Sequence, residues 1–139
     1  MDDTNCPTGE LLSVENTPMD FRLPIRIGDR IDDPFFAPTH GIDANWMLCS
    51  SSQKQLSLAA TLSAAGRTMQ VLTTSPALQV YTANFVEENI GKSGTLYRPQ
   101  NAICLETQNV PDAPNHPSFP SAVLRPGETY FEQTVYKFI

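Results

Sequence analysis

Two neighbouring stretches of the chain alternate between apolar and polar residues with the period of a β-strand. Between Leu56 and Leu62 the even positions are apolar, and a second alternation runs over residues 67–74. Side chains of a strand point alternately to its two faces, so this pattern predicts two half-buried strands. A short Ala-Ala-Gly sequence ending at Gly66 separates them. We therefore expect the two strands to form a β-hairpin with a tight turn.

The other apolar segments are short and are separated by turn residues, which is typical of further strands rather than helices. Strands are expected around Gln79 and at 103–105, 122–124 and 129–138. Loops are expected at 32–41, 87–94 and 111–120, a turn at 50–52, and at most one helical turn near 27–31. No long stretch has the helical period, so the sequence predicts an all-β fold.

Glu106 stands out among the charged residues because of its place on an expected strand. It follows the strand-forming residues 103–105 and precedes a loop that contains Pro111, Pro114 and Pro117, so it is expected near the end of that strand. Alternation separates Glu106 from Ile103 and Leu105, and if those two face the core, Glu106 faces a cleft or solvent. A carboxylate fixed by a strand can act as an acid or base. On this pattern alone, an ordinary surface glutamate is the simpler interpretation.

Charge and cysteine content narrow the possible classes of protein. A net charge of -6 and a pI near 4.7 argue against binding to nucleic acid. No apolar run approaches a membrane span, and the acidic first residues lack the pattern of a signal peptide, so a soluble, cytoplasmic protein is expected. The cysteines are widely spaced, which predicts reduced thiols rather than disulfides or a zinc site; they are Cys6, Cys49 and Cys104.

Several common catalytic motifs are missing from the sequence. There is no phosphate-binding glycine loop, no nucleophile elbow and no pair of zinc ligands, and no metal site is expected. The two histidines, His40 and His116, lie in separate expected loops. For each, a loop histidine with local hydrogen bonds is a simpler interpretation than a ligand or a base.

A series of short motifs follows in order along the whole chain. They are residues 7–10 (PTGE), 41–43 (GID), 66–67 (GR) with 71–74 (VLTT), 79–85 (QVYTANF), 104–108 (CLETQ), 111–115 (PDAPN), 119–120 (FP) and 124–128 (LRPGE). In this order and spacing the sequence resembles the aldose 1-epimerases, the galactose mutarotases. Each motif alone is a weak signal, but together they are highly specific.

The resemblance implies a fold and a boundary. Residues 1–139 are similar to the C-terminal part of a longer, galactose-mutarotase-like β-supersandwich, so the chain is expected to lack the N-terminal half of an aldose 1-epimerase domain. A sheet without its neighbouring strands exposes backbone groups and apolar faces. We therefore expect pairing with an N-terminal half, self-association or marginal stability. The residues expected to be exposed are Leu56, Leu58, Leu62, Phe131 and Val135.

The resemblance also implies site residues and a monosaccharide substrate, without a cofactor. The family's catalytic base corresponds to Glu106, and the residues that bind sugar hydroxyls correspond to Asp43 and Gln79. We expect these three on one concave face. The family's general acid, a histidine, belongs to the N-terminal half, and neither histidine of this chain matches it. Many family members have histidine after the aspartate, where this chain has Ala44.

The expected activity is therefore that of an aldose 1-epimerase, an isomerase of carbohydrate metabolism. It would interconvert the α and β anomers of free aldohexoses such as glucose or galactose, and the isolated chain is expected to be incomplete. Two alternatives remain open. One is a non-catalytic carbohydrate-binding or regulatory module, and the other is a truncated product with no activity.

Overall fold

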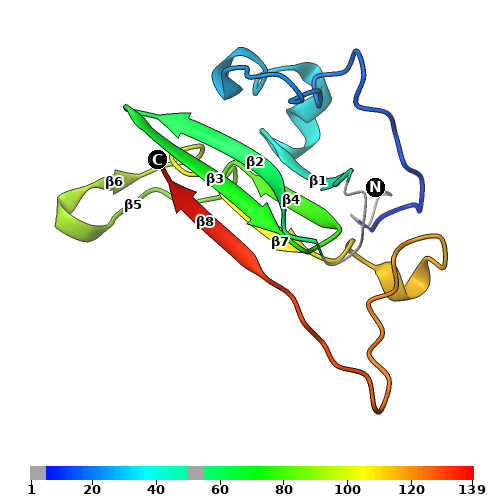
Figure 1. Ribbon diagram of the computed structural model, residues 1–139. Coiled ribbons are helices and arrows are strands. Elements are labelled where there is room, and N and C mark those ends of the chain that lie inside the picture. The colour runs from blue at the N-terminus through cyan, green and yellow to red at the C-terminus, as the bar shows by residue number, and fades with distance from the viewer. Residues whose placement is uncertain (1–5, 50–54) are drawn as a thin grey trace. The chain divides into compact units, whose positions relative to one another are not determined.

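Strands dominate the computed structural model, which describes residues 6–49 and 55–139. The strands are β1 (Asp43–Met47), β2 (Ser57–Ala64), β3 (Arg67–Thr73), β4 (Ala77–Tyr81), β5 (Asn89–Ile90), β6 (Leu96–Tyr97), β7 (Cys104–Gln108) and β8 (Thr134–Phe138) (Figure 1). The helical segments are short 3₁₀ turns: η1 (Ile27–Asp29), η2 (Pro34–Thr39), η3 (Lys92–Gly94) and η4 (Ala113–Asn115). The all-β prediction is confirmed.

The strands form two three-stranded sheets, in the orders β1-β4-β7 and β2-β3-β8, and β5 pairs with β6. Strands β2 and β3 are antiparallel, with Ala64 opposite Arg67. The turn between them places Ala65 at φ 49° and Gly66 at φ 74°. Positive φ at both central positions is typical of a type I′ turn, a two-residue hairpin turn whose twist matches that of its strands. The predicted hairpin is therefore confirmed.

The register of this hairpin changes within β2. Leu58 lies opposite Leu72, but Ala60 lies opposite Val71. One extra residue in β2, a β-bulge, reverses the faces of the residues before it. Leu58 therefore shares the face of Leu72, whereas Ala60 and Leu62 take the other. The expectation that all even positions of this stretch share one face was wrong, because alternation cannot reveal a bulge.

Strand β8 pairs antiparallel with β3 and also contacts β7. Thr73 lies opposite Thr134, and the Thr134 hydroxyl is hydrogen-bonded to that of Thr107 at 2.5 Å. The Tyr136 hydroxyl donates to the Leu105 carbonyl at 3.0 Å. Val71 and Thr73 are fully buried. One face of the β2-β3-β8 sheet thus faces β7, as in a sandwich.

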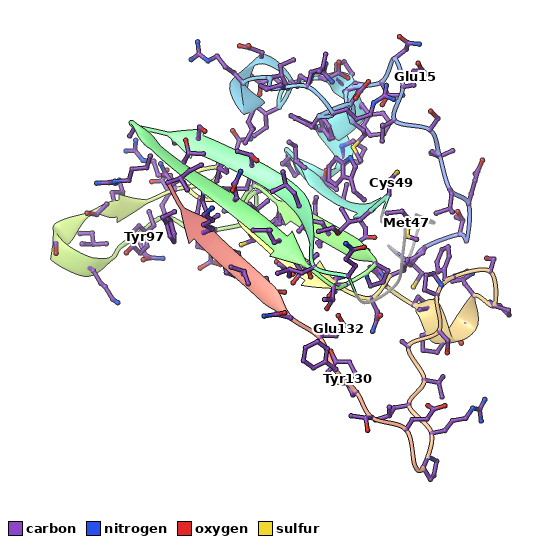
Figure 2. All side chains as sticks on the ribbon, in the orientation of Figure 1. Glu15, Met47, Cys49, Tyr97, Tyr130 and Glu132 are labelled. Atoms are coloured by element: carbon purple, nitrogen blue, oxygen red, sulfur yellow. The ribbon has the colours of Figure 1, made fainter. Side chains whose placement is uncertain are left out.

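The chain divides into two compact units. Unit 1 comprises Met1–Gly9, Asn45–Gln79 and Leu105–Ile139, and unit 2 comprises Glu10–Ala44 and Val80–Cys104. In unit 1 a small core forms around β4 and η4, and Met47, labelled in Figure 2, packs against it. Its members are Ala77, Val110, Ala113 and Phe119.

Unit 1 also includes His116, which has structural partners. Its Nε2 lies 2.9 Å from the Pro7 carbonyl oxygen and 3.4 Å from a carboxylate oxygen of Asp112. The ring also packs against Phe119, with 5.0 Å between the ring centroids. His116 therefore ties the segment near Pro7 to the loop that contains η4.

In unit 2, side chains hold much of the irregular backbone. Arg30 donates to the carbonyls of Thr17, Pro18 and Asp20 at 2.9–3.1 Å. Its guanidinium lies 5.5 Å from the centroid of the Phe21 ring, a cation–π distance. A single cation therefore organises the segment before η1.

The segment expected as a loop at 32–41 contains η2. The Asp33 carboxylate caps this helix by accepting from the Phe35 N–H at 2.9 Å, and Pro34 occupies the first helical position. Proline is favoured there because its N–H would have no helical partner. The Asp33–Pro34 pair, which we interpreted as part of a loop, therefore also marks the start of a 3₁₀ helix.

Three further expectations need correction. Residues 122–124 are not a strand, and the final strand begins only at Thr134 rather than at 129. Val123 and Leu124 are exposed, and among the described residues no strand pairs with them, so their apolar character was not sufficient for a strand. The expected loop at 87–94 contains β5 and η3. The turn expected at 50–52 lies outside the described residues.

Exposure of the apolar side chains follows the expectation in part. Leu56, Leu58 and Phe131 are exposed, whereas Leu62 and Val135 are half-buried. Leu62 lies opposite Met69, and Val135 lies opposite Leu72. These cross-strand apolar neighbours cover part of both side chains. No helix of residues 6–49 and 55–139 is long and apolar enough to cross a membrane.

Candidate active site

The three residues singled out from the sequence lie on three neighbouring strands. Asp43 is on β1, Gln79 on β4 and Glu106 on β7. Strand β4 is the central strand of the β1-β4-β7 sheet. These strands are far apart in sequence, and local patterns did not predict that they would be neighbours.

Glu106 is exposed in the middle of β7, since this strand continues to Gln108. The expectation that Glu106 sits near the strand's end was therefore wrong. The Thr107 hydroxyl bonds to Thr134 of β8, so alternation turns Glu106 away from β8. A carboxylate on a paired strand has a fixed backbone, and its exposure makes it accessible to a ligand.

Gln79 is the half-buried central residue of β4. Ala77, two positions earlier, shares its face and belongs to the core of unit 1. Leu78 points to the opposite face and is only 4% exposed. Strand geometry therefore separates Gln79 from the apolar Leu78.

Asp43 is half-buried and is the first residue of β1. It follows Gly41 and Ile42, which are both buried. Alternation places Asp43 on the same face of β1 as Asn45 and Met47. The direction of the Asp43 side chain is set by the two peptides that flank its Cα, and the Ile42 peptide is the first of these.

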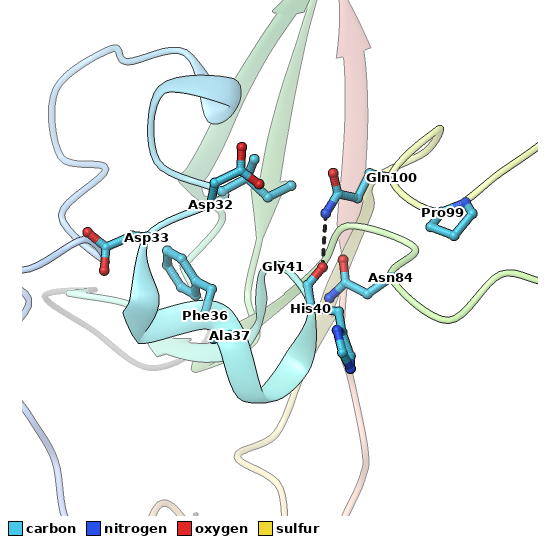
Figure 3. A pocket seen from close by; sticks show the side chains of 10 residues that line it. Asp32, Asp33, Phe36, Ala37, His40, Gly41, Asn84, Pro99 and Gln100 are labelled. Carbon is cyan, nitrogen blue, oxygen red and sulfur yellow. Dashed lines mark hydrogen bonds between the residues drawn. The ribbon is translucent and has the colours of Figure 1, made fainter.

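A cavity of about 470 Å³ lies in unit 2, beside η2 (Figure 3). Its lining includes Asp32, Asp33, His40, Asn84 and Gln100. Asp43 does not line it. The His40 ring packs edge-on against Phe85, with 5.8 Å between centroids.

No group of three or more histidine, cysteine, aspartate or glutamate residues within residues 6–49 and 55–139 could hold a metal ion. The three cysteines, all in the described part of the chain, are free thiols.

Comparison with known proteins identifies the family. Residues 1–137 match the family model described as aldose 1-epimerase. The chain is 42% identical over 139 residues to the galactose mutarotase of mouse, covering 99% of this chain and 40% of that protein. It is 33% identical over 143 residues to the aldose 1-epimerase of Escherichia coli, covering 100% of this chain and 41% of that protein.

A solved structure agrees. The structure described as a GalM/aldose epimerase homologue from C. elegans matches with a TM-score of 0.82 and 28% identity, covering 99% of this chain and 41% of that chain. The protein belongs to the aldose 1-epimerase family, and its fold is the β-sandwich of that family. The chain spans about 40% of the length of the curated relatives it matches.

Sequence reasoning missed two residues that contact the backbone next to Asp43. Thr82 and Asn84 both hydrogen-bond to Ile42. Both lie in the 79–85 motif that carried the family resemblance, yet only Gln79 received a role from it. The signal that could have revealed them is the spacing of Thr82 and Asn84, two polar residues at i and i+2 in a motif that begins on a strand.

Proposed function

We propose that this protein is the part of a mutarotase that supplies its catalytic base and part of its sugar-binding site. Glu106 takes the proton from the anomeric hydroxyl, and Asp43 and Gln79 bind other sugar hydroxyls. The observation that carries the proposal is that Gln79 and Glu106 occupy the neighbouring strands β4 and β7 of unit 1 in a member of the aldose 1-epimerase family. The exposed carboxylate of Glu106 also supports it.

Ring opening of an aldohexose needs a base at the anomeric hydroxyl and an acid at the ring oxygen, because proton transfers in step avoid separated charges. Glu106 provides the base. The acid comes from outside this chain in our proposal, since neither His40 nor His116 corresponds to the family's acid. His116 in addition serves the structural contacts with Pro7 and Asp112.

A partner is therefore part of the proposal. We infer that the chain acts with a segment equivalent to the rest of a family domain, and that without it the chain self-associates. Four exposed apolar side chains on or before β8 support this: Tyr130, Phe131, Tyr136 and Phe138. Sedimentation of the purified chain tests it, and a stable monomer with full activity would contradict it.

The catalytic test uses a fusion in which these 139 residues replace the matching part of the mouse galactose mutarotase, called the mouse fusion below. Polarimetry of freshly dissolved α-D-galactose and α-D-glucose measures mutarotation, and cooperative thermal unfolding verifies folding. We expect a rate well above the uncatalysed one that Glu106→Gln abolishes. A folded mouse fusion with no rate enhancement, or an unchanged rate in Glu106→Gln, would overturn the proposal.

A second candidate is a carbohydrate-binding module without turnover. The observation that favours it is an aromatic pair in unit 2, where Phe85 is 59% exposed and stacks on Tyr81 with 6.4 Å between centroids. Exposed aromatic rings can pack against the apolar face of a sugar. Calorimetric titration beside polarimetry separates the two, because binding without rate enhancement favours the module.

We also propose a cytoplasmic location. The three free thiols of the described chain support it, because reducing compartments keep cysteines unpaired.

A further inference from the structure

We propose that Thr82 and Asn84 are positioning residues for Asp43, which they orient by holding the Ile42 peptide in front of it. The inference rests on the proposed function, in which Asp43 binds the sugar. It assigns to these two side chains a role in substrate affinity that acts through Asp43.

Both polar groups of the Ile42 backbone are bound by these side chains. The Ile42 N–H donates to the Thr82 hydroxyl at 2.9 Å, and the Ile42 carbonyl accepts from the Asn84 amide at 3.0 Å. The Thr82 backbone N–H donates to the same carbonyl at 3.0 Å. The Thr82 hydroxyl donates to the Asn84 Oδ1 at 2.6 Å, which locks the two side chains together.

This network is buried. Ile42 is 1% exposed, Thr82 3% and Asn84 5%. A buried polar group that loses its partner is not compensated by water, so each of these bonds resists local rearrangement. Buried networks whose members all have partners are also the ones that fix a single geometry.

The backbone just before Ile42 is held in the same way. The His40 carbonyl accepts from the Gln100 side chain at 2.9 Å, the dashed line in Figure 3, and the Gly41 carbonyl accepts from the Thr39 hydroxyl at 2.6 Å. With Ile42, three consecutive carbonyls are therefore bound by side chains. These hydrogen bonds restrain each peptide of the segment, which ends where β1 begins at Asp43.

Gly41 completes the arrangement by its lack of a side chain. Its φ is +140°, and a Cβ at this position would lie 2.4 Å from the Asn84 Oδ1. Asn84 can therefore reach the Ile42 carbonyl only because residue 41 is glycine. The Gly-Ile-Asp motif and the Thr82–Asn84 pair form one unit.

Holding this peptide has a consequence for binding. The direction of the Asp43 side chain is set by the backbone at its own Cα, and the Ile42 peptide is one of the two that define it. A hydrogen bond to a sugar hydroxyl requires the carboxylate to be held within a few tenths of an ångström. Loosening the Ile42 peptide should therefore weaken binding while leaving the base at Glu106 in place.

The test compares Thr82→Val with Thr82→Ser in the mouse fusion. Valine has the shape of threonine without its hydroxyl, and serine keeps the hydroxyl. We expect Thr82→Val to raise KM for α-D-galactose about tenfold with a smaller change in kcat, and Thr82→Ser to stay within about twofold of the parent. Thr74→Val is the matched control, since its buried hydroxyl bonds to Glu132 and Gln133 instead. It should lower the melting temperature without raising KM.

A double-mutant cycle with Asp43→Asn separates positioning from general destabilisation. If Thr82 acts through Asp43, Thr82→Val should raise KM much less in the Asp43→Asn background. An equal rise in both backgrounds, or a KM change as small as that of Thr74→Val, would overturn the positioning role.

Should Thr82→Val fail to fold, Gln100→Ala takes its place. Gln100 is exposed and holds the preceding His40 carbonyl, and we expect about a threefold rise in KM that vanishes with Asp43→Asn. If KM does not rise in Gln100→Ala, the positioning role is overturned. A folded but inactive parent fusion would instead overturn the proposed function itself, so the two failures are distinguishable.

Discussion

The β2-β3-β8 sheet and the irregular backbone of unit 2 are held together in different ways. In the sheet, backbone pairs with backbone: seven residue pairs align β2 with β3 and five align β3 with β8. In unit 2, side chains bind the carbonyls: Arg30 binds three, Thr39 binds two, and Gln100 and Asn84 bind one each.

The difference determines how each region should respond to substitution. Backbone pairing between strands needs the correct alternation of apolar and polar residues, but it tolerates many side chains at exposed positions. A carbonyl bound by one side chain loses its partner when that side chain is removed, and a buried carbonyl then has no water to replace it. Unit 2 should therefore be more sensitive to single substitutions than the sheets.

The largest expected effect is a loss of activity without a loss of stability, caused by a substitution on the paired strand β7. Glu106→Gln in the mouse fusion should lower the mutarotation rate about 1,000-fold, within the range of general acid–base catalysis. Because Glu106 is exposed on β7, the urea midpoint should remain within experimental error. Polarimetry and urea unfolding of one preparation measure both. A large loss of stability would mean that Glu106 stabilises the fold rather than acting as the catalytic base.

Two glycines with positive φ, Gly41 in unit 2 and Gly66 in the β2–β3 turn, test whether the two regions differ in sensitivity to substitution. Gly41→Ala should destabilise the mouse fusion by roughly 3 kcal/mol, because it combines the unfavourable φ with a clash against Asn84. Gly66→Ala in the hairpin turn meets no atom within 4 Å at φ +74°. It should therefore cost only the backbone term, about 1 kcal/mol. Urea unfolding measures both, and equal effects would contradict the difference between the regions.

Two arginines give the next contrast. Arg30→Met removes the donor of three carbonyls and the contact with Phe21, so we expect a loss of about 2 kcal/mol in the free energy of unfolding. Arg67→Met, at the exposed start of β3, should change it by less than about 0.5 kcal/mol. Arg30→Lys should recover only part of the loss, since an ammonium lacks the guanidinium fork. A full recovery would show that charge alone matters at this position.

The smallest effect is a pH dependence in unit 2. Hydrogen bonds from the Arg22 side chain lower the pKa of Asp20 from 3.8 to about 2. A carboxyl whose pKa is lower in the folded state stabilises that state at pH values above its pKa in the unfolded chain. This contribution is therefore complete above about pH 4 and is lost as the pH falls toward 2. NMR titration of the Asp20 carboxyl measures the shift, and Arg22→Gln should return the pKa toward 3.8. An unchanged pKa in Arg22→Gln would assign the shift to another group.

Much of the fold could be predicted from local patterns. Alternation around the Ala-Ala-Gly turn predicted β2 and β3, and the ordered motifs identified the family. Alternation also predicted that Glu106 would point away from Leu105, because successive side chains of a regular strand point to opposite faces. For the candidate site, the roles of Asp43, Gln79 and Glu106 came from the family resemblance and remain proposals.

Other features required the tertiary structure. The bulge between Leu58 and Ala60 depends on how β2 meets β3, and the neighbours of β4 depend on packing across the whole chain. The hydrogen bonds from Thr82 and Asn84 to Ile42 span 40 and 42 residues. The sequence by itself therefore determined the β2–β3 hairpin with its turn, the all-β class and the family, since these rest on short-range patterns and ordered motifs. Only the folded chain decided which side chains hold the backbone before Asp43, because that depends on contacts between residues far apart in sequence.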